Sequence, residues 1–180
     1  VKWNKDFKDW DLSIENMKFI SEKGAWPETQ VKIAHKYNEG SKTKSITTEI
    51  EYCRIEDIRD LLLKSGYVED RVFKYLRHSL PAGELENVEY QSTSSETEVS
   101  EFFLSAKVNN LSLKAYEKVP GLSDVSGEIF SNQSSGLLAI NTKNARLDFK
   151  GILLEPIVVD SLTGNIEWLK DESGWNFSSS

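Results

Sequence analysis

The first part of the chain, residues 1–53, alternates between apolar and polar side chains with the two-residue period of strands that bury one face. The alternation that begins at Trp10 changes phase at Met17, which predicts a β-bulge one or two residues earlier. Two further runs with the same period lie at residues 31–35 and 46–52. The pattern therefore predicts three strands of a one-sided sheet.

A two-helix insert is predicted at residues 54–80, where the apolar period lengthens to that of a helix. Apolar residues around Ile58 form one face of a first helix, and Gly66 is placed to end it. A second helix around Val72 must stop before Pro81, because the residue preceding a proline disfavours the helical region. We expect these helices to cap one end of the sheet and to cover an edge that would otherwise pair with other chains.

Residues 81–180 return to the period of strands. The candidate strands are residues 85–90, 102–108, 111–113, 127–130, 136–141, 145–149, 157–159, 164–168 and 175–177. A stretch rich in Ser and Thr, residues 92–97, is predicted to be a loop. Connections of hairpin length leave no room for parallel crossovers outside the helical insert. The sequence therefore predicts a mainly β fold, a curved antiparallel meander with one helical insert.

One short pattern occurs twice, at Asp124–Ile129 and at Ser161–Ile166, 37 positions apart. Each copy places a hydroxyl residue and then a glycine, Gly127 or Gly164, ahead of an isoleucine, which is typical of a tight turn that leads into a strand. A weaker third copy is Pro81–Leu85. Repeated units that cannot bury their apolar face alone must stack on neighbours, so we expect residues 1–180 to be one segment of a larger repetitive protein.

Two arrangements of the predicted sheet remain open. The sheet could close on itself as a barrel or sandwich and seal its apolar face. Alternatively, it could form an open groove whose apolar face is accessible, and a contiguous patch of that kind marks a ligand or a partner. The alternation of side chains alone does not distinguish a sealed core from a groove lining.

Composition excludes several classes of protein. The 180 residues are 38% hydrophobic and 28% charged, and no apolar run approaches the ~20 residues of a membrane span. The net charge is −7 and the 22 basic residues are scattered, so binding to nucleic acid has no electrostatic support. Cys53 is the only cysteine, which excludes an internal disulfide. The start at Val1 and the end at Ser180 lead us to expect an excised internal segment.

The sequence contains few candidate catalytic residues. His35 lies on the apolar face of a predicted strand and His78 at the end of a predicted helix, where both have ordinary structural roles. No nucleophile, phosphate-binding or dinucleotide-binding motif is present. Trp168 and Trp175 flank a predicted hairpin connection, so we expect a cross-strand pair, the alternative being a sugar-stacking platform. We therefore predict a protein that is not an enzyme and has neither cofactor nor metal.

Three passages carry a resemblance to a known family. Residues 68–87 contain a short helix followed by Leu-Pro-Ala-Gly-Glu-Leu, and residues 119–129 and 147–168 contain two further loose motifs in a distinctive order. Together they resemble the large YhdP-like envelope proteins of the AsmA-like group, which are similar to bridge-like lipid transfer proteins. The resemblance implies a periplasmic segment of a Gram-negative bacterium, in a full-length protein anchored in the inner membrane by a part that lies outside this segment.

The same resemblance implies a function in moving phospholipid from the inner to the outer membrane through an apolar β-groove. The partners would be phospholipid acyl chains and flanking segments of the same chain. The expected lining residues are Phe102, Leu104, Ala106, Val108, Leu138, Ile140, Leu147, Phe149, Ile157 and Val159. One alternative is a structural or assembly module that packs against neighbouring segments or a protein partner and binds no lipid. Another is an enzyme or carbohydrate-binding domain that uses Trp168 or Trp175.

Overall fold

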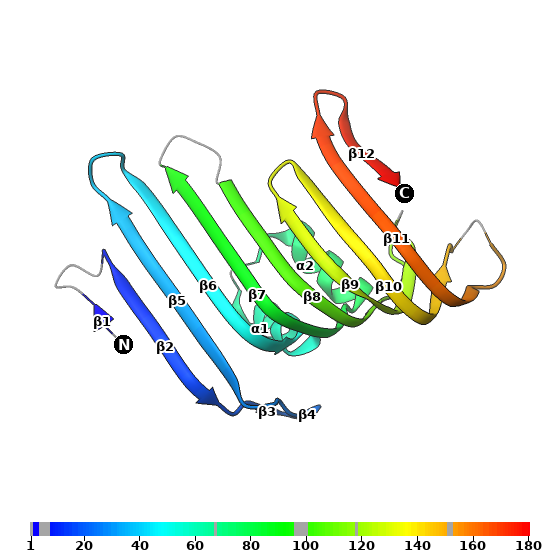
Figure 1. The fold of residues 1–180 in the computed structure, drawn as a ribbon, viewed down its shortest axis with the longest axis horizontal. Coiled ribbons are helices and arrows are strands. Elements are labelled where there is room, and N and C mark those ends of the chain that lie inside the picture. The colour runs from blue at the N-terminus through cyan, green and yellow to red at the C-terminus, as the bar shows by residue number, and fades with distance from the viewer. Residues whose placement is uncertain (1, 4–7, 67, 96–100, 118, 151–152) are drawn as a thin grey trace.

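The protein is a long antiparallel sheet with two helices inserted near its middle (Figure 1). A computed structural model describes residues 2–3, 8–66, 68–95, 101–117, 119–150 and 153–180. The strands are β1 (Lys2–Trp3), β2 (Trp10–Met17), β3 (Ile20–Ser21), β4 (Gly24–Ala25), β5 (Thr29–Asn38), β6 (Thr43–Arg54), β7 (Ala82–Ser95), β8 (Glu101–Leu113), β9 (Gly121–Asn132), β10 (Ser135–Asp148), β11 (Ile157–Asp171) and β12 (Gly174–Ser179). The helices are α1 (Ile55–Ser65) and α2 (Asp70–Ser79). The predicted fold class is confirmed.

The main sheet is an open meander. Its ten strands follow the order β1-β2-β5-β6-β7-β8-β9-β10-β11-β12, and every described pair is antiparallel. The strands β3 and β4 form a separate two-stranded hairpin between β2 and β5. Within the described residues, the edge strands β1 and β12 do not pair with each other. Of the two arrangements that the sequence left open, the structure has the open sheet.

Both helices end where the sequence predicts. Gly66 adopts the left-handed conformation at the end of α1, with φ 74°, and Leu80 does so at the end of α2, directly before Pro81. α1 packs against β6 and β7, which lie in the middle of the sheet, and Figure 1 shows α1 near these strands and α2 behind β8 and β9. The expectation that the helices cover a sheet edge was therefore wrong. The chain enters α1 directly from β6 and returns from α2 to β7, so the helices stay beside the middle of the sheet.

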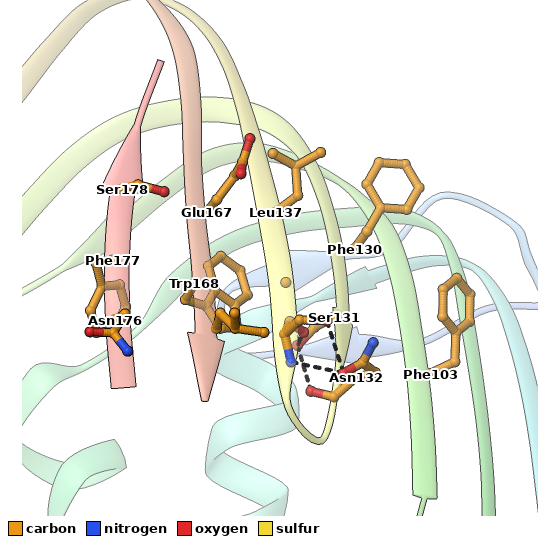
Figure 2. Close-up of a pocket in the computed structure, with 13 residues that line it drawn as sticks. Phe103, Phe130, Ser131, Asn132, Leu137, Glu167, Trp168, Asn176, Phe177 and Ser178 are labelled. Carbon is orange, nitrogen blue, oxygen red and sulfur yellow. Dashed lines mark hydrogen bonds between the residues drawn. The ribbon is translucent and has the colours of Figure 1, made fainter. Parts of the chain in front are cut away.

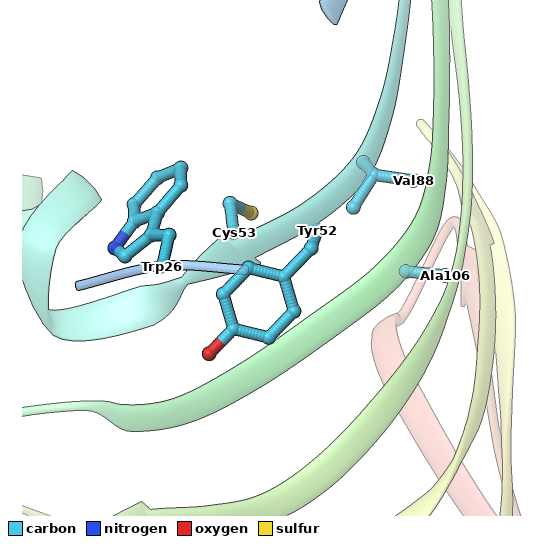
Figure 3. Packing of buried hydrophobic residues seen from close by; sticks show 5 residues of the cluster. All are labelled: Trp26, Tyr52, Cys53, Val88 and Ala106. Carbon is cyan, nitrogen blue, oxygen red and sulfur yellow. The ribbon is translucent and has the colours of Figure 1, made fainter. Parts of the chain in front are cut away.

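A first core cluster joins the sheet to the helical insert. It contains Trp26, Tyr52, Cys53, Val88 and Ala106, all buried, and Figure 3 shows these five side chains. Partly buried residues from β2, α1 and β9 pack around them. The indole of Trp26, which follows β4, meets Tyr52 edge-on with 5.8 Å between the ring centroids. The β3–β4 hairpin is thereby held against the sheet and α1.

Polar residues with positive φ interrupt the long strands. The described strands contain five of them, at Asn16, Asn87, Asn110, Asp124 and Asn144, with φ between 52° and 60°. Asn and Asp tolerate this left-handed conformation better than other non-glycine residues. The registers shift beside these positions, which marks β-bulges. The bulge predicted before Met17 is confirmed.

These bulges explain why the sequence predicted too many short strands. A bulge changes which side chains face the core, so one long strand shows two runs of alternation that are out of phase. The predicted strands 102–108 and 111–113 are in fact one strand, β8, interrupted at Asn110. β10 likewise joins two predicted strands across Asn144, and β11 joins two more. β7 continues to Ser95, so the loop predicted at residues 92–97 was wrong over its described part, and residues 96–97 lie outside the described residues.

Hydroxyl side chains satisfy the backbone where the bulges break the ladder. The amide of Asn110 donates to Ser126 Oγ at 3.0 Å, and the amide of Asp124 donates to Ser112 Oγ at 3.4 Å. Thr142 Oγ1 donates to the carbonyl of Asp124 at 2.5 Å. Backbone groups left without a partner would be costly here. Ser126, the hydroxyl residue of the first copy of the repeated pattern, thus serves the sheet itself.

The two glycines of the repeated pattern lie inside strands, so the predicted turns were wrong. Gly127 is in β9 and Gly164 in β11, and the two flank Ile140 of β10, which is paired with both. A β-carbon at Gly127 would lie 2.1 Å from the carbonyl oxygen of Ala139. Glycine is required at Gly127 because neighbouring backbone occupies the space that a side chain would need.

We expect Gly127→Ala to lower the free energy of unfolding by about 1–3 kcal/mol, because the backbone of β10 must move to admit a methyl group. Gly40→Ala is the matched control, since its β-carbon would approach only the Asn38 side chain, at 3.4 Å. Urea denaturation of both variants measures the difference. Equal midpoints for the two variants would contradict the close approach of β9 and β10.

Candidate functional site

One row of apolar side chains crosses the sheet from strand to strand. The printed registers and core contacts place these residues beside one another: Ile14, Val31, Ile50, Val88, Ala106, Ile129, Leu138 and Ile166. We call this set the apolar row. With neighbouring strands ~4.8 Å apart, a row over the strands β2 to β11 without the small hairpin extends about 34 Å. The row runs perpendicular to the strands and along the long axis of the sheet.

Burial varies along the apolar row. Val31, Val88 and Ala106 are buried, the last two in the cluster that joins the sheet to the helical insert, whereas Ile166 of β11 exposes 38% of its surface. On β12, Phe177, which is paired with Trp168 of β11, exposes 71%. The apolar face is therefore covered in the middle of the sheet and becomes accessible towards its C-terminal strands.

A hollow of about 570 Å³ lies among the accessible C-terminal strands, β8 to β12 (Figure 2). Trp168 and Phe177 are directly paired across β11 and β12, and both line it. Trp168 lies against the backbone of Gly136, where a β-carbon would come within 2.1 Å of the indole. Phe130 and Leu137, a second cross-strand pair, border the hollow from the other face of the sheet, because they alternate with Ile129 and Leu138 of the apolar row. Aromatic side chains and polar residues such as Asn132, Glu167 and Asn176 share the lining, so the hollow is mixed in character.

The residues predicted as lining fall into three groups. Phe102, Leu104, Ala106 and Val108 share one face of β8, and Phe102 stacks on Tyr90 with 6.3 Å between the centroids. Leu138, Ile140 and Val159 meet in a second core cluster with Val125 and Ala145. Leu147 and Ile157 are paired across β10 and β11, whereas Phe149 follows the end of β10.

Accessibility differs among these residues. Ala106, Val108 and Ile140 expose only 6%, 4% and 8% of their surface, so they form the buried floor of the apolar face. Phe102, Leu104 and Leu138 are half-buried and Ile157 is exposed. The side chains that could touch a ligand are therefore the larger ones beside this floor.

Sequence reasoning missed several residues of the apolar face. Ile129 and Ile166 are the direct cross-strand neighbours of Leu138 on β9 and β11. Trp168 was considered as a hairpin partner, but its position over Gly136 was not foreseen. Ile129 and Ile166 are the isoleucines that end the two copies of the repeated pattern, which was the available signal. Pairing the two copies with Leu138 required the register, which only the structure shows.

The expected pairing of Trp168 with Trp175 was wrong. The two-residue turn between Asp171 and Gly174 places Trp168 opposite Phe177 and Trp175 opposite Lys170. The Lys170 ammonium lies 5.8 Å from the centroid of the Trp175 ring, a cation–π contact. Because the register of a tight hairpin is set by its turn, the aromatic pairing follows from two residues of loop.

The two histidines and the cysteine make structural contacts. His35 Nδ1 lies 2.9 Å from the carbonyl of Lys8, and its ring stacks on Trp10. His78 Nδ1 lies 2.7 Å from the carbonyl of Lys74, within its own helix. Burial raises the pKa of the Cys53 thiol to about 11, which keeps it protonated at neutral pH.

The described ranges contain neither a metal-binding cluster nor a membrane-spanning helix. No group of three or more His, Cys, Asp or Glu residues there is arranged to hold a metal ion. In the same part of the chain, neither helix has the length and apolar character needed to cross a bilayer.

The fold and its face define a class of protein: a segment of open antiparallel sheet with one partly accessible apolar side. The chain belongs to the YhdP protein family, whose family model matches residues 1–180, so the resemblance found in the sequence is confirmed. It is 21% identical over 175 residues to the intermembrane phospholipid transporter YhdP of Escherichia coli (strain K12). The match covers 92% of this chain and 13% of that relative, so the chain spans a small part of its length. No solved structure matches the chain.

Proposed function

We propose that this chain is a segment of a phospholipid-conducting groove that serves transport between the inner and outer membranes of a Gram-negative envelope. The observation that carries the proposal is the apolar row, which continues across an open sheet. The printed name of the Escherichia coli relative supports phospholipid as the cargo. The segment would work in the periplasm, within a longer protein anchored in the inner membrane, and would meet the membranes only through other parts of that protein.

The physical basis is the similar environment that a bilayer and an apolar groove offer to a lipid tail. Removing a methylene from water is worth ~0.8 kcal/mol in either place, so transfer between them is nearly neutral. A continuous apolar row lowers the barrier to moving a tail without any reactive side chain. Tails would move along the row, across the strands, while the headgroups stay in water.

We expect a photo-crosslinking residue at Leu104 in the intact protein to form adducts with phospholipid in cells, because Leu104 is half-buried beside the apolar row. The same residue at Lys107 of β8 is the matched control, since Lys107 is exposed and pairs with Glu86 at 2.8 Å. Mass spectrometry of the adducts identifies the lipid. Equal labelling at both positions, or none at Leu104, would refute the groove.

An assembly module that binds no lipid is the second candidate. Phe103 and Phe130 favour it, because they expose 42% and 41% of their surface and alternate with groove residues on β8 and β9. Such residues suit packing against a neighbouring segment. Adducts to protein alone at Leu104 would favour this candidate over lipid conduction.

A further inference from the structure

A second cavity, of about 760 Å³, lies away from the apolar row, beside α2. Val72 and Tyr75 of α2 form one wall. Tyr116 and Val119, from the connection between β8 and β9, form the other, and their backbones exchange hydrogen bonds of 3.1 and 3.0 Å. The cavity thus lies between a helix and a connection that are distant in sequence.

Few contacts hold α2 against the sheet, and this leaves the cavity open. The carbonyl of Ser79 accepts a 2.6 Å hydrogen bond from the amide of Lys114, just after β8. The ring of Tyr116 stacks on His78 at 4.8 Å and meets Tyr75 edge-on at 6.3 Å. Ser79 is the buried residue of α2, and Val72 exposes 46% of its surface. The aromatic wall is therefore fixed, while apolar surface remains uncovered at the mouth.

Two cations at this cavity have no acidic partner in the part of the chain that the structure describes. Arg71 and Lys74 line it, are exposed, and form no ion pair with any described residue. Near α1, the cations Lys23, Arg54 and Arg59 are paired with aspartates. In a chain of 29 acidic and 22 basic residues, two unpaired cations beside a cavity form a local positive site.

One acidic residue, Glu117, also lines the cavity. Desolvation and, after it, the adjacent Glu117 carboxylate raise the pKa of Tyr116. With Arg71 and Lys74 against Glu117, the lining keeps a net charge of +1, which favours an anion.

We propose that this cavity binds the headgroup region of a single phospholipid, with Arg71 and Lys74 on the phosphodiester and the Val72–Tyr75–Tyr116 wall on the glycerol and first methylenes. Guanidinium and ammonium groups bind phosphate well, and apolar walls give no advantage to a free inorganic anion. The choice of phospholipid rests on the proposed function. The site is separate from the apolar row, so it holds a lipid beside the groove.

The test places a photo-crosslinking residue at Val72 of the intact protein, mixed with vesicles of phosphatidylglycerol and phosphatidylcholine. We expect a phospholipid adduct whose yield falls about tenfold in the Arg71→Glu, Lys74→Glu double variant, because each cation near a lipid phosphate contributes substantially to binding. Arg77→Glu is the matched control, since Arg77 is exposed on the same helix but does not line the cavity. Adding inorganic phosphate should leave the adduct in place.

Three results would overturn the site. The first is no lipid adduct at Val72, and the second is displacement of the adduct by inorganic phosphate. The third is an equal loss of adduct yield in Arg77→Glu, which would mean general attraction to a charged surface. The crosslinker at Leu104, measured in the same double variant, separates this inference from the proposed function. Labelling retained at Leu104 and absent at Val72 overturns only the cavity. Labelling absent at Leu104 overturns the groove, and a charge-dependent lipid adduct at Val72 would still support the cavity.

Discussion

Replacing Leu138 with aspartate is expected to slow phospholipid transport by the intact protein more than tenfold. Leu138 lies in the apolar row between Ile129 of β9 and Ile166 of β11. A carboxylate there keeps its water, and a lipid tail that passes must displace that water or leave the row. Desolvating an unpaired charge costs several kcal/mol, and each 1.4 kcal/mol added to a barrier slows a step tenfold.

The matched control for this change is Asn141→Asp, which adds the same charge three residues along β10 at an exposed position. Transport of labelled phospholipid between the two membranes is the measurement, and Leu138→Met shows whether a change of shape alone matters. Thermal unfolding of each variant checks that the sheet is intact. A folded Leu138→Asp protein that transports lipid at the normal rate would rule out passage along the apolar row.

Replacing Asp57 with alanine is expected to lower the free energy of unfolding by about 3 kcal/mol. Asp57 Oδ2 accepts a 2.7 Å hydrogen bond from the Trp26 indole and lies 3.4 Å from Arg54 Nη1, and the side chain is only 4% exposed. Its removal leaves a buried indole N–H and a largely buried guanidinium without their shared partner, which costs far more than losing an exposed ion pair. The β3–β4 hairpin would then be held to α1 mainly through exposed contacts such as Lys23 with Asp60.

Asp60→Ala provides the comparison on the same helix. Asp60 is paired with Lys23 at 2.5 Å and with Arg59 at 2.7 Å, but its side chain is 38% exposed. Water screens such pairs, so we expect a loss of about 1 kcal/mol or less. Urea denaturation of both variants tests the difference. If Asp57→Ala and Asp60→Ala lose the same stability, burial of the Trp26 contact is not what holds the hairpin.

The helical insert and its ends were predictable because their signals are local. Gly66 and Pro81 act on the one or two residues beside them, and they end α1 and α2 as expected. The bulge before Met17 was visible for the same reason, as a change of phase within one strand. At Asn110 and Asn144, however, the same change of phase was interpreted as the gap between two strands.

The groove prediction likewise separates into features that follow from one strand and features that depend on pairing between strands. Residues on one face of β8 follow from alternation within a single strand, and Leu104 packs against the cluster that contains Ala106. The pairing of Trp168 with Phe177, and the position of Trp168 over Gly136, depend on register between strands. A shift of one residue turns every side chain to the other face of the sheet. The turn fixes the register of the β11–β12 hairpin, whereas the contact of Trp168 with Gly136 depends on the register between β10 and β11, whose connection spans residues 149–156.

The sequence by itself determined the class of fold, the family and the apolar composition of one sheet face, because periodicity, turn residues and motif order are local properties of the chain. Only the tertiary structure decided that the sheet stays open, that Ala106 and Ile140 are sealed while Phe177 is exposed, and that α2 and Tyr116 enclose a separate cavity. Those features depend on register and on contacts between segments far apart in the chain, and such contacts form only when the whole sheet is assembled.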